Sequence, residues 1–93
     1  VATSSSFLSF VGKTAVALSE KEGLQVERVV IPQGSARYVE FYLTGRNYPF
    51  KAQITRDATS QAHDIAVMTR YIDSHGISPQ YVDCRVEGKA YWK

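Results

Sequence analysis

Two neighbouring stretches of this sequence alternate between apolar and more polar side chains, and a short turn sequence separates them. Residues 37–44 place Val39, Phe41 and Leu43 on one side, and residues 48–54 do the same with Tyr48, Phe50, Ala52 and Ile54. Successive side chains of a strand point to opposite faces, so each stretch predicts a strand with one buried face. Thr44-Gly45-Arg46-Asn47 has turn chemistry. We therefore expect an antiparallel pair of strands. Pro49 cannot donate a ladder hydrogen bond, so we expect that end of the second strand to be an edge or to lie outside the ladder.

The remaining segments add two helices and three further strands. The spacing predicts helices over residues 6–22 and from about residue 60 to 75, and strands at 24–31, 81–86 and 89–93. Gly23 and Gly76 follow the last turns of the two helices, where glycine is favoured. Consecutive strands joined by short turns indicate an α+β fold with an antiparallel sheet of about five strands, both helices on one face, and the order α-β-β-β-α-β-β.

Each predicted helix carries an apolar stripe that should face the sheet. In the first helix the stripe consists of Phe7, Val11, Thr14, Ala15 and Leu18. In the second helix it consists of Ala62, Ile65, Met68 and Ile72, with Ala66 and Tyr71 beside it. Residues 1–5 are small and Ser-rich and predict a linker or frayed terminus.

Length and composition limit the classes of function. A chain of 93 residues predicts a single domain over residues 1–93. The formal net charge of +2 is too small to indicate binding to nucleic acid or to an anionic membrane. One cysteine excludes a disulfide within the chain, and no apolar run reaches the roughly 18 residues of a membrane span. The chain begins at Val1, which leaves room for a targeting or anchoring segment upstream.

The C-terminal stretch predicts a hairpin that ends the sheet. Val82, Cys84 and Val86 fall on one side of the first strand, and Glu87-Gly88 suits a two-residue turn because Gly88 accepts a positive φ. The returning strand would then be Lys89 to Lys93. As the last element it would have a free outer edge, which is either a hazard or a site for a partner strand.

A two-residue turn fixes the register of this hairpin. Arg85 would then lie opposite Ala90, and Asp83 opposite Trp92, with all four on the face away from Cys84. Tyr91 would lie opposite Cys84 on the other face. A longer turn would exchange the two faces, so the sides are less firmly fixed than the strand itself.

Several residues resemble catalytic or metal-binding groups, but their contexts argue otherwise. Gly12-Lys13-Thr14 lacks the earlier glycine of a phosphate-binding loop and falls in a predicted helix. His63 and His75 lie near opposite ends of one helix, too far apart to share a metal. Cys84 lies among apolar neighbours, which is typical of a buried structural cysteine. We therefore expect no catalytic residues, no metal and no cofactor.

Aromatic residues are concentrated on the predicted strands and at their ends: Tyr38, Tyr42, Tyr48, Tyr81, Tyr91 and Trp92. Aromatic side chains on a sheet stack on bases in RNA-recognition modules, but the element order and the glycine-aromatic consensus of that module are missing here. Aromatics at a strand edge also suit an interface between proteins. This distribution favours protein binding over nucleic-acid binding.

The C-terminal segment resembles the extracytoplasmic β domain of the FtsQ/DivIB cell-division proteins. In that family a helix and a short loop precede a strand of the form aromatic or apolar, hydrophobic, Asp, hydrophobic, Arg, and a closing hairpin follows. Gln80-Tyr81-Val82-Asp83-Cys84-Arg85 matches this form, with Cys84 in place of the more usual aliphatic residue. The order of the preceding segments also agrees, so the resemblance covers roughly residues 24–93 and fits the first helix more loosely.

The resemblance implies a non-enzymatic scaffold of the cell-division complex, or divisome, which functions in septation. Family members carry a single membrane span, a POTRA domain and then this domain outside the membrane. Neither the span nor the POTRA domain is visible in these residues. The implied partners are FtsB/DivIC-like and FtsL-like proteins, bound by β-strand addition to the last strand. The corresponding partner-binding residues here would be Arg85, Lys89, Ala90, Tyr91, Trp92 and Lys93.

Two alternatives remain open at this point. Another extracytoplasmic α+β interaction module, such as a second POTRA-like domain, would also use strand pairing. An enzyme domain would need Cys84 and His63 in a polar pocket. The sequence upstream discriminates the scaffold from the other interaction modules, because the scaffold requires one apolar span followed by about one small domain.

Overall fold

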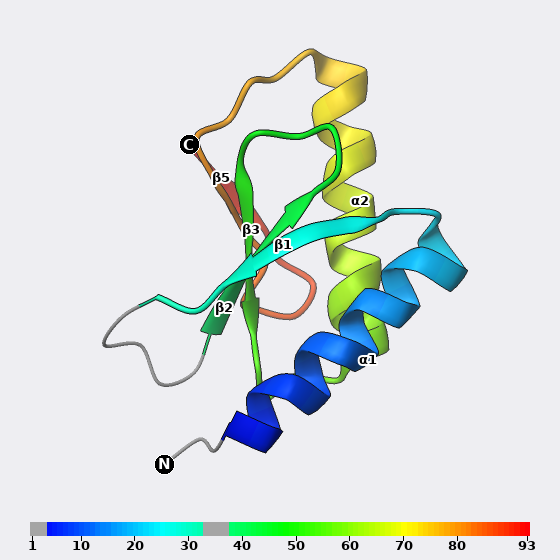
Figure 1. The fold of residues 1–93 in the computed structure, drawn as a ribbon. Helices are drawn as coiled ribbons and strands as arrows, with labels where there is room; N and C mark the ends of the chain where they lie inside the picture. The colour runs from blue at the N-terminus through cyan, green and yellow to red at the C-terminus, as the bar shows by residue number, and fades with distance from the viewer. Residues whose placement is uncertain (1–3, 33–37) are drawn as a thin grey trace.

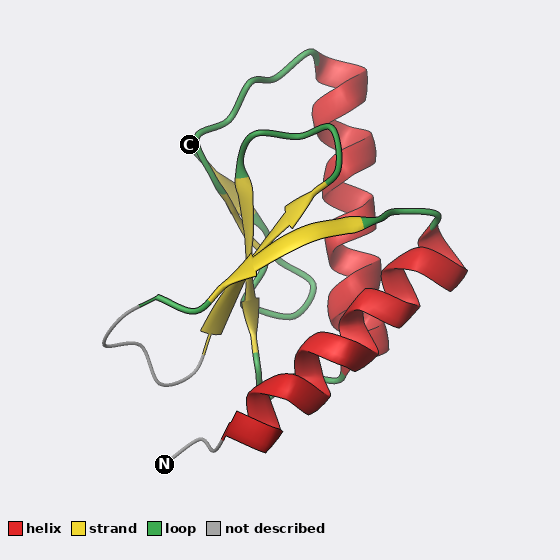
Figure 2. Ribbon diagram, in the orientation of Figure 1, coloured by secondary structure: helices red, strands yellow, loops and turns green. Residues whose placement is uncertain are grey.

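The computed structural model describes residues 4–32 and 38–93 and shows an α+β fold in the predicted order (Figure 1). The elements are α1 (Ser4–Glu22), β1 (Val26–Val30), β2 (Tyr38–Leu43), β3 (Pro49–Gln53), α2 (Ala58–His75), β4 (Val82–Asp83) and β5 (Tyr91–Trp92). Both helices lie on the same side of the sheet, as expected (Figure 2). No helix among the described residues combines the length and the apolar character that a membrane crossing requires.

The five strands form one sheet in the order β1-β2-β3-β4-β5, which is also their order along the chain. Neighbouring strands are antiparallel except for β3 and β4, which are parallel. Strands β3 and β4 are parallel because α2 connects them. The helix runs back along one face of the sheet, so β4 starts at the same end of the sheet as β3 and runs in the same direction. The expected antiparallel sheet is therefore a mixed sheet at this one pair.

The registers of the four pairs align residues in rows that cross the whole sheet. One row faces the helices and consists of Val29, Phe41, Phe50, Val82 and Trp92. The adjacent row faces away from them and consists of Val30, Glu40, Lys51, Asp83 and Tyr91. Phe41, Phe50 and Val82 are fully buried, whereas Trp92 at the end of the same row is 46% exposed. Burial therefore decreases toward the C-terminal edge.

Helix α1 is longer and rotated relative to the prediction. It begins at Ser4, so Ser4 and Ser5 belong to the helix and not to a linker, and residues 1–3 of the predicted linker lie outside the described residues. Phe10 and Ala17 are buried together with the predicted Thr14 and Leu18, whereas Phe7 and Val11 are only partly buried. The buried face of α1 therefore differs from the predicted stripe by part of a turn. Apolar residues cover more than one face of this helix, and packing against α2 determines which face is buried.

Helix α2 packs as predicted and has well-defined ends. Ala62, Ile65, Met68 and Ile72 are buried, which confirms the predicted stripe. At the N-terminus the Asp57 carboxylate accepts a hydrogen bond of 2.9 Å from the Ser60 backbone N–H. At the C-terminus Gly76 has a φ of 63° and its N–H bonds back to the Ile72 carbonyl.

Candidate functional site

The C-terminal hairpin that carries the predicted partner-binding residues is short. Strands β4 and β5 pair at Val82 with Trp92 and at Asp83 with Tyr91. Between the strands, the Lys89 N–H donates a hydrogen bond of 3.1 Å to the Val86 carbonyl, which closes a turn over Glu87-Gly88. Gly88 has a φ of 72°, as the sequence predicted, and this sign of φ is required at the third position of a type II turn.

The predicted register of this hairpin is wrong by one residue. Asp83 lies opposite Tyr91, not Trp92, so Tyr91 shares the helix-free face with Asp83, and Trp92 shares the helix-facing side with Val82. The turn over Glu87-Gly88 is present, but β4 ends at Asp83 and β5 begins only at Tyr91. The strands are therefore joined by a loop of residues 84–90, which is longer than the predicted two-residue turn. A shift of one residue exchanges the two faces of a strand. Val86, 53% exposed, belongs to this loop and not to the buried face.

Strand β5 forms one edge of the sheet, as predicted, and β1 forms the other. The pairing of Lys93 shows which backbone groups of β5 face outward. The Lys93 N–H donates to the Tyr81 carbonyl at 3.3 Å, and the Lys93 carbonyl accepts a hydrogen bond from the Gln80 N–H. Successive residues of a strand direct these groups to opposite sides. The N–H and C=O of Trp92 therefore point away from β4, toward the free edge.

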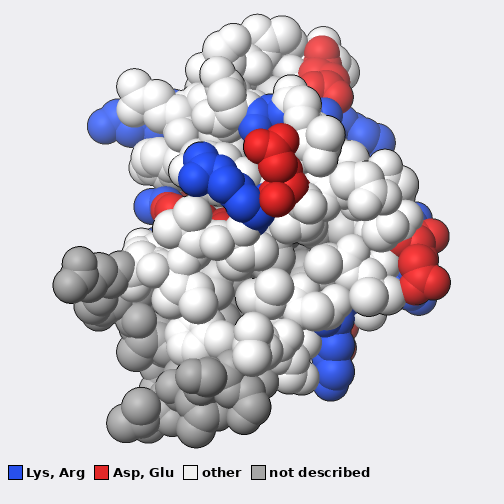
Figure 3. Space-filling model, in the orientation of Figure 1, with Lys and Arg blue, Asp and Glu red and all other residues white. Residues whose placement is uncertain are grey.

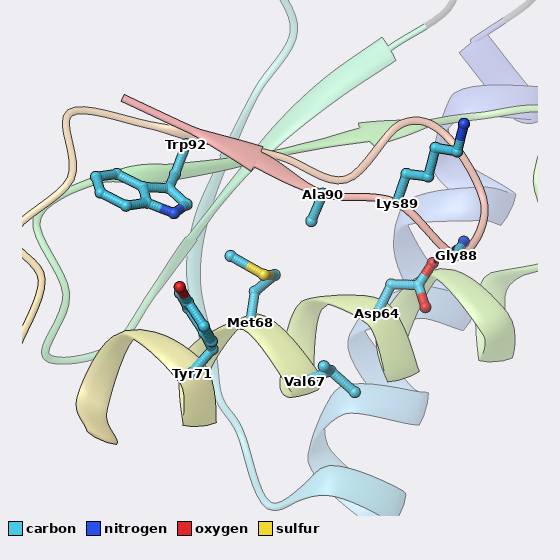
Figure 4. A pocket seen from close by; sticks show the side chains of 8 residues that line it. All are labelled: Asp64, Val67, Met68, Tyr71, Gly88, Lys89, Ala90 and Trp92. Atoms are coloured by element: carbon cyan, nitrogen blue, oxygen red, sulfur yellow. Dashed lines mark hydrogen bonds between the residues drawn. The ribbon is translucent and has the colours of Figure 1, made fainter. Parts of the chain in front are cut away.

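An apolar groove runs beside this edge, between β5 and α2 (Figure 4). Its volume is about 330 Å³, and Figure 4 shows the Trp92 indole above it and the side chains of Met68 and Tyr71 rising from α2 below. Val67 and Tyr71 are 43% and 42% exposed, although both are large apolar side chains. Exposed apolar residues that line a groove mark candidate interaction sites.

The other face of the edge carries an ion pair. The Arg85 Nε and Nη2 atoms donate to the two carboxylate oxygens of Asp83 at 2.9 and 2.8 Å, and the Arg85 guanidinium lies 4.8 Å from the centre of the Tyr38 ring. Partial burial works to raise the pKa of Asp83, but the hydrogen bonds from Arg85 prevail and hold that pKa below its usual value. The same side-chain hydrogen bond raises the pKa of Arg85. Arg85 is therefore already paired within the domain.

The structure separates five of the six predicted partner-binding residues into two groups and leaves Lys93 in neither. Lys89, Ala90 and Trp92 line the groove on the helix side. Arg85 and Tyr91 lie on the helix-free face, where Tyr91 is 58% exposed. Lys93 has an exposed side chain and uses its backbone to hold β5 against β4.

Sequence reasoning did not identify the α2 side of the groove. Asp64, Val67 and Tyr71 lie next to β5 only because α2 crosses behind the sheet before β4 begins. One signal was available in the sequence. Val67 and Tyr71 are apolar residues four positions apart on a surface helix, outside the stripe that fills the core.

The residues considered for catalysis, Cys84, His63 and His75, lie in different surroundings. Cys84 is fully buried, and burial, followed by the nearby negative charges of Asp64 and Asp83, raises the pKa of its thiol to about 12. His63 Nδ1 lies 3.6 Å from a Glu22 carboxylate oxygen, and His75 Nδ1 lies 2.9 Å from the Tyr71 carbonyl oxygen. The described residues contain no group of three or more His, Cys, Asp or Glu side chains arranged to hold a metal.

Charged side chains form small mixed groups on the face that Figure 3 shows, with uncharged surface between them. A broad surface of positive charge is the usual footprint of a nucleic-acid-binding protein. The described residues visible on this face do not form one. This distribution agrees with the small net charge of +2.

Comparison of the chain with family models, with curated proteins and with solved structures gives no match.

Proposed function

We propose that this domain is a non-enzymatic scaffold module of the FtsQ/DivIB type, which binds divisome proteins on the extracytoplasmic side of the membrane. The observation that carries the proposal is the edge strand β5, whose Trp92 N–H and C=O point away from the sheet. A strand from a partner pairs with such groups, and its side chains then determine specificity. The partners proposed from the resemblance are FtsB/DivIC-like and FtsL-like proteins.

The side chains around the edge support strand addition over a purely structural role. Tyr91 and Trp92 are 58% and 46% exposed, and they project to opposite faces of the same short strand. A long, flat apolar edge is a hazard that proteins avoid, whereas β5 has only two residues and is followed by the charged Lys93. An edge with exposed aromatics and limited length suits a partner that pairs over a few residues.

The two faces of the edge predict what the partner strand must contain. Its side chains on the helix side lie beside Trp92 and over the groove formed with Val67 and Tyr71, so apolar residues fit there. Its side chains on the other face lie beside Tyr91 and near the pair formed by Asp83 and Arg85. An acidic partner residue that reaches Arg85 must share its guanidinium with Asp83, which reduces the gain from that contact.

Two substitutions at Trp92 test the proposal because both remove the indole but only one removes the backbone donor. Trp92→Ala keeps the outward N–H, and Trp92→Pro eliminates it. An edge strand tolerates proline where its N–H faces outward, so both variants should fold, which thermal unfolding checks. Binding of a synthetic FtsB/DivIC-type peptide to the parent and to both variants is measured by calorimetry.

We expect Trp92→Ala to weaken binding and Trp92→Pro to weaken it by roughly a further tenfold, the size of one lost hydrogen bond. Equal affinities of the two variants would show that the peptide does not pair with the Trp92 backbone. An intact parent domain that ignores the peptide would refute the proposed partner class.

A further inference from the structure

We infer that Arg56, Gln61 and Asp64, here named the loop clamp, position the β5 edge by holding the loop of residues 84–90 against α2. The effect on partner binding that this inference predicts rests on the proposed function, whereas the effect on the loop itself does not. None of the three residues belongs to β5, and only Asp64 reaches the groove beside it. Their contacts go instead to backbone groups of the loop.

Arg56 is the centre of the loop clamp. Its side chain is only 8% exposed, and its Nη1 atom donates a hydrogen bond of 2.9 Å to the Cys84 carbonyl. Its Nη2 atom lies 2.9 Å from an Asp64 carboxylate oxygen and also 2.9 Å from the Ser60 hydroxyl. Its Nε atom is buried without a hydrogen-bond partner among the described residues. Because this guanidinium is incompletely satisfied, its burial depends strongly on the Asp64 charge.

Gln61 and Asp64 hold the loop at two points, its first residue and its turn. The Gln61 amide is fully buried and donates a hydrogen bond of 2.8 Å to the same Cys84 carbonyl, while its oxygen accepts one of 3.0 Å from the Gln53 N–H. The Asp64 carboxylate accepts a hydrogen bond of 3.3 Å from the Gly88 N–H, visible at the right of Figure 4. The loop is therefore fixed where it leaves β4 and again at its turn.

The hairpin needs such external support because its own strands contribute little. Strands β4 and β5 pair at only two positions, and Val86 to Lys89 are all exposed. A two-stranded ribbon of this length is not stable alone in water. An edge that is already ordered loses less conformational entropy when a partner strand binds, so the loop clamp increases affinity by ordering the edge beforehand.

A second ion pair on α2 provides a matched control. Asp73 accepts two hydrogen bonds of 2.9 and 2.8 Å from Arg46, which follows β2. Asp64→Asn and Asp73→Asn change the net charge equally, on the same helix, and each removes the charge from one arginine pair. Of these two aspartates, only Asp64 contacts the loop of residues 84–90.

Amide hydrogen exchange of the free domain, followed residue by residue with NMR, tests the inference. We expect Asp64→Asn to speed exchange at Tyr91 and Lys93 at least tenfold more than at Phe41 in the central strand, because the hairpin opens without global unfolding. Asp73→Asn should leave the exchange rates of Tyr91 and Lys93 unchanged relative to that of Phe41. If Asp64→Asn fails to fold, Arg56→Lys replaces it. Lysine keeps the charge but has a single nitrogen in place of the two with which Arg56 reaches Cys84 on one side and Ser60 and Asp64 on the other.

Unchanged exchange at β5 in Asp64→Asn, or an equal increase at Phe41, would overturn the inference. The strand peptide that tests the proposed function adds a second readout, in which Asp64→Asn should lower affinity severalfold and Asp73→Asn should not. A parent domain that binds no peptide would refute the proposed function, while the exchange rates would still decide whether the loop clamp orders the edge.

Discussion

The hairpin β2–β3 and the hairpin β4–β5 are held together in different ways. Strands β2 and β3 pair at five positions, and their helix-facing residues, such as Phe41 and Phe50, are fully buried. Strands β4 and β5 pair at two positions, and polar side chains of α2 and the turn before it fix the loop between them. The first hairpin is stabilised by apolar burial, and the second retains exposed apolar surface and an open edge. This difference indicates that the centre of the sheet supplies stability and that its C-terminal edge is available for binding.

The largest expected effect compares two aromatic residues of the same row. Phe50→Ala should lower the free energy of unfolding by about 3–5 kcal/mol, because it leaves a cavity in the enclosed core. Trp92→Ala should cost only roughly 1 kcal/mol, because the indole is 46% exposed and the strand end can relax around its loss. Urea unfolding of both variants measures the difference. Similar costs would mean that the edge is as much a part of the core as the centre.

Removal of a side chain from the helix layer should have the next largest effect. Ile65 is fully buried between α2 and the sheet, so Ile65→Ala should cost roughly 2–5 kcal/mol. Val67→Ala, two residues further along on the exposed side of α2, should cost about 0.5 kcal/mol or less. Thermal and urea unfolding provide both values. A cost below about 0.5 kcal/mol for Ile65→Ala would contradict the packing of α2.

Cys84 lies where the two regions meet, and its reactivity reports how readily the edge opens. Burial raises the pKa of this thiol to about 12, so the native protein should react with a thiol reagent on the order of a hundredfold more slowly than the unfolded chain. Asp64→Asn should speed up labelling of Cys84 in the native protein more than Asp73→Asn does. Labelling of the native parent protein as fast as that of the unfolded chain would show that residue 84 is not enclosed.

The smallest effect concerns Asp83 and pH. Because the folded-state pKa of Asp83 is lowered by Arg85, its contribution to stability is present above the unfolded pKa of about 3.9 and is lost as pH falls through the folded value. The difference in unfolding free energy between the parent and Asp83→Asn should therefore shrink from about pH 5 downward. Urea unfolding over a pH series measures it. A difference that grows with acidity would contradict the assigned pair.

The central sheet could be predicted from sequence because burial there imposes strict alternation on β2 and β3. The buried face of α1 could not be predicted, because its apolar residues, such as Phe7 and Phe10, lie on more than one face of the helix. The parallel pairing of β4 with β3 depends on where α2 returns the chain, which local patterns do not encode. The sequence predicted that β5 is an edge strand without an outer neighbour, but it did not predict the register between β5 and β4. Tyr91 and Trp92 are both aromatic, so either could face the helices, and the loop beyond Cys84 decided between them.

Exchange of the Trp92 backbone amide, with and without the FtsB/DivIC-type peptide, tests most directly whether β5 accepts a strand. In the free domain the Trp92 amide should exchange rapidly, while those of Tyr91 and Lys93 are already protected by β4. A saturating concentration of peptide should slow exchange at Trp92 by at least about tenfold, because the partner then accepts its hydrogen bond. Protection of Trp92 in the free domain, or rapid exchange that persists when the peptide is bound, would contradict strand addition at this edge.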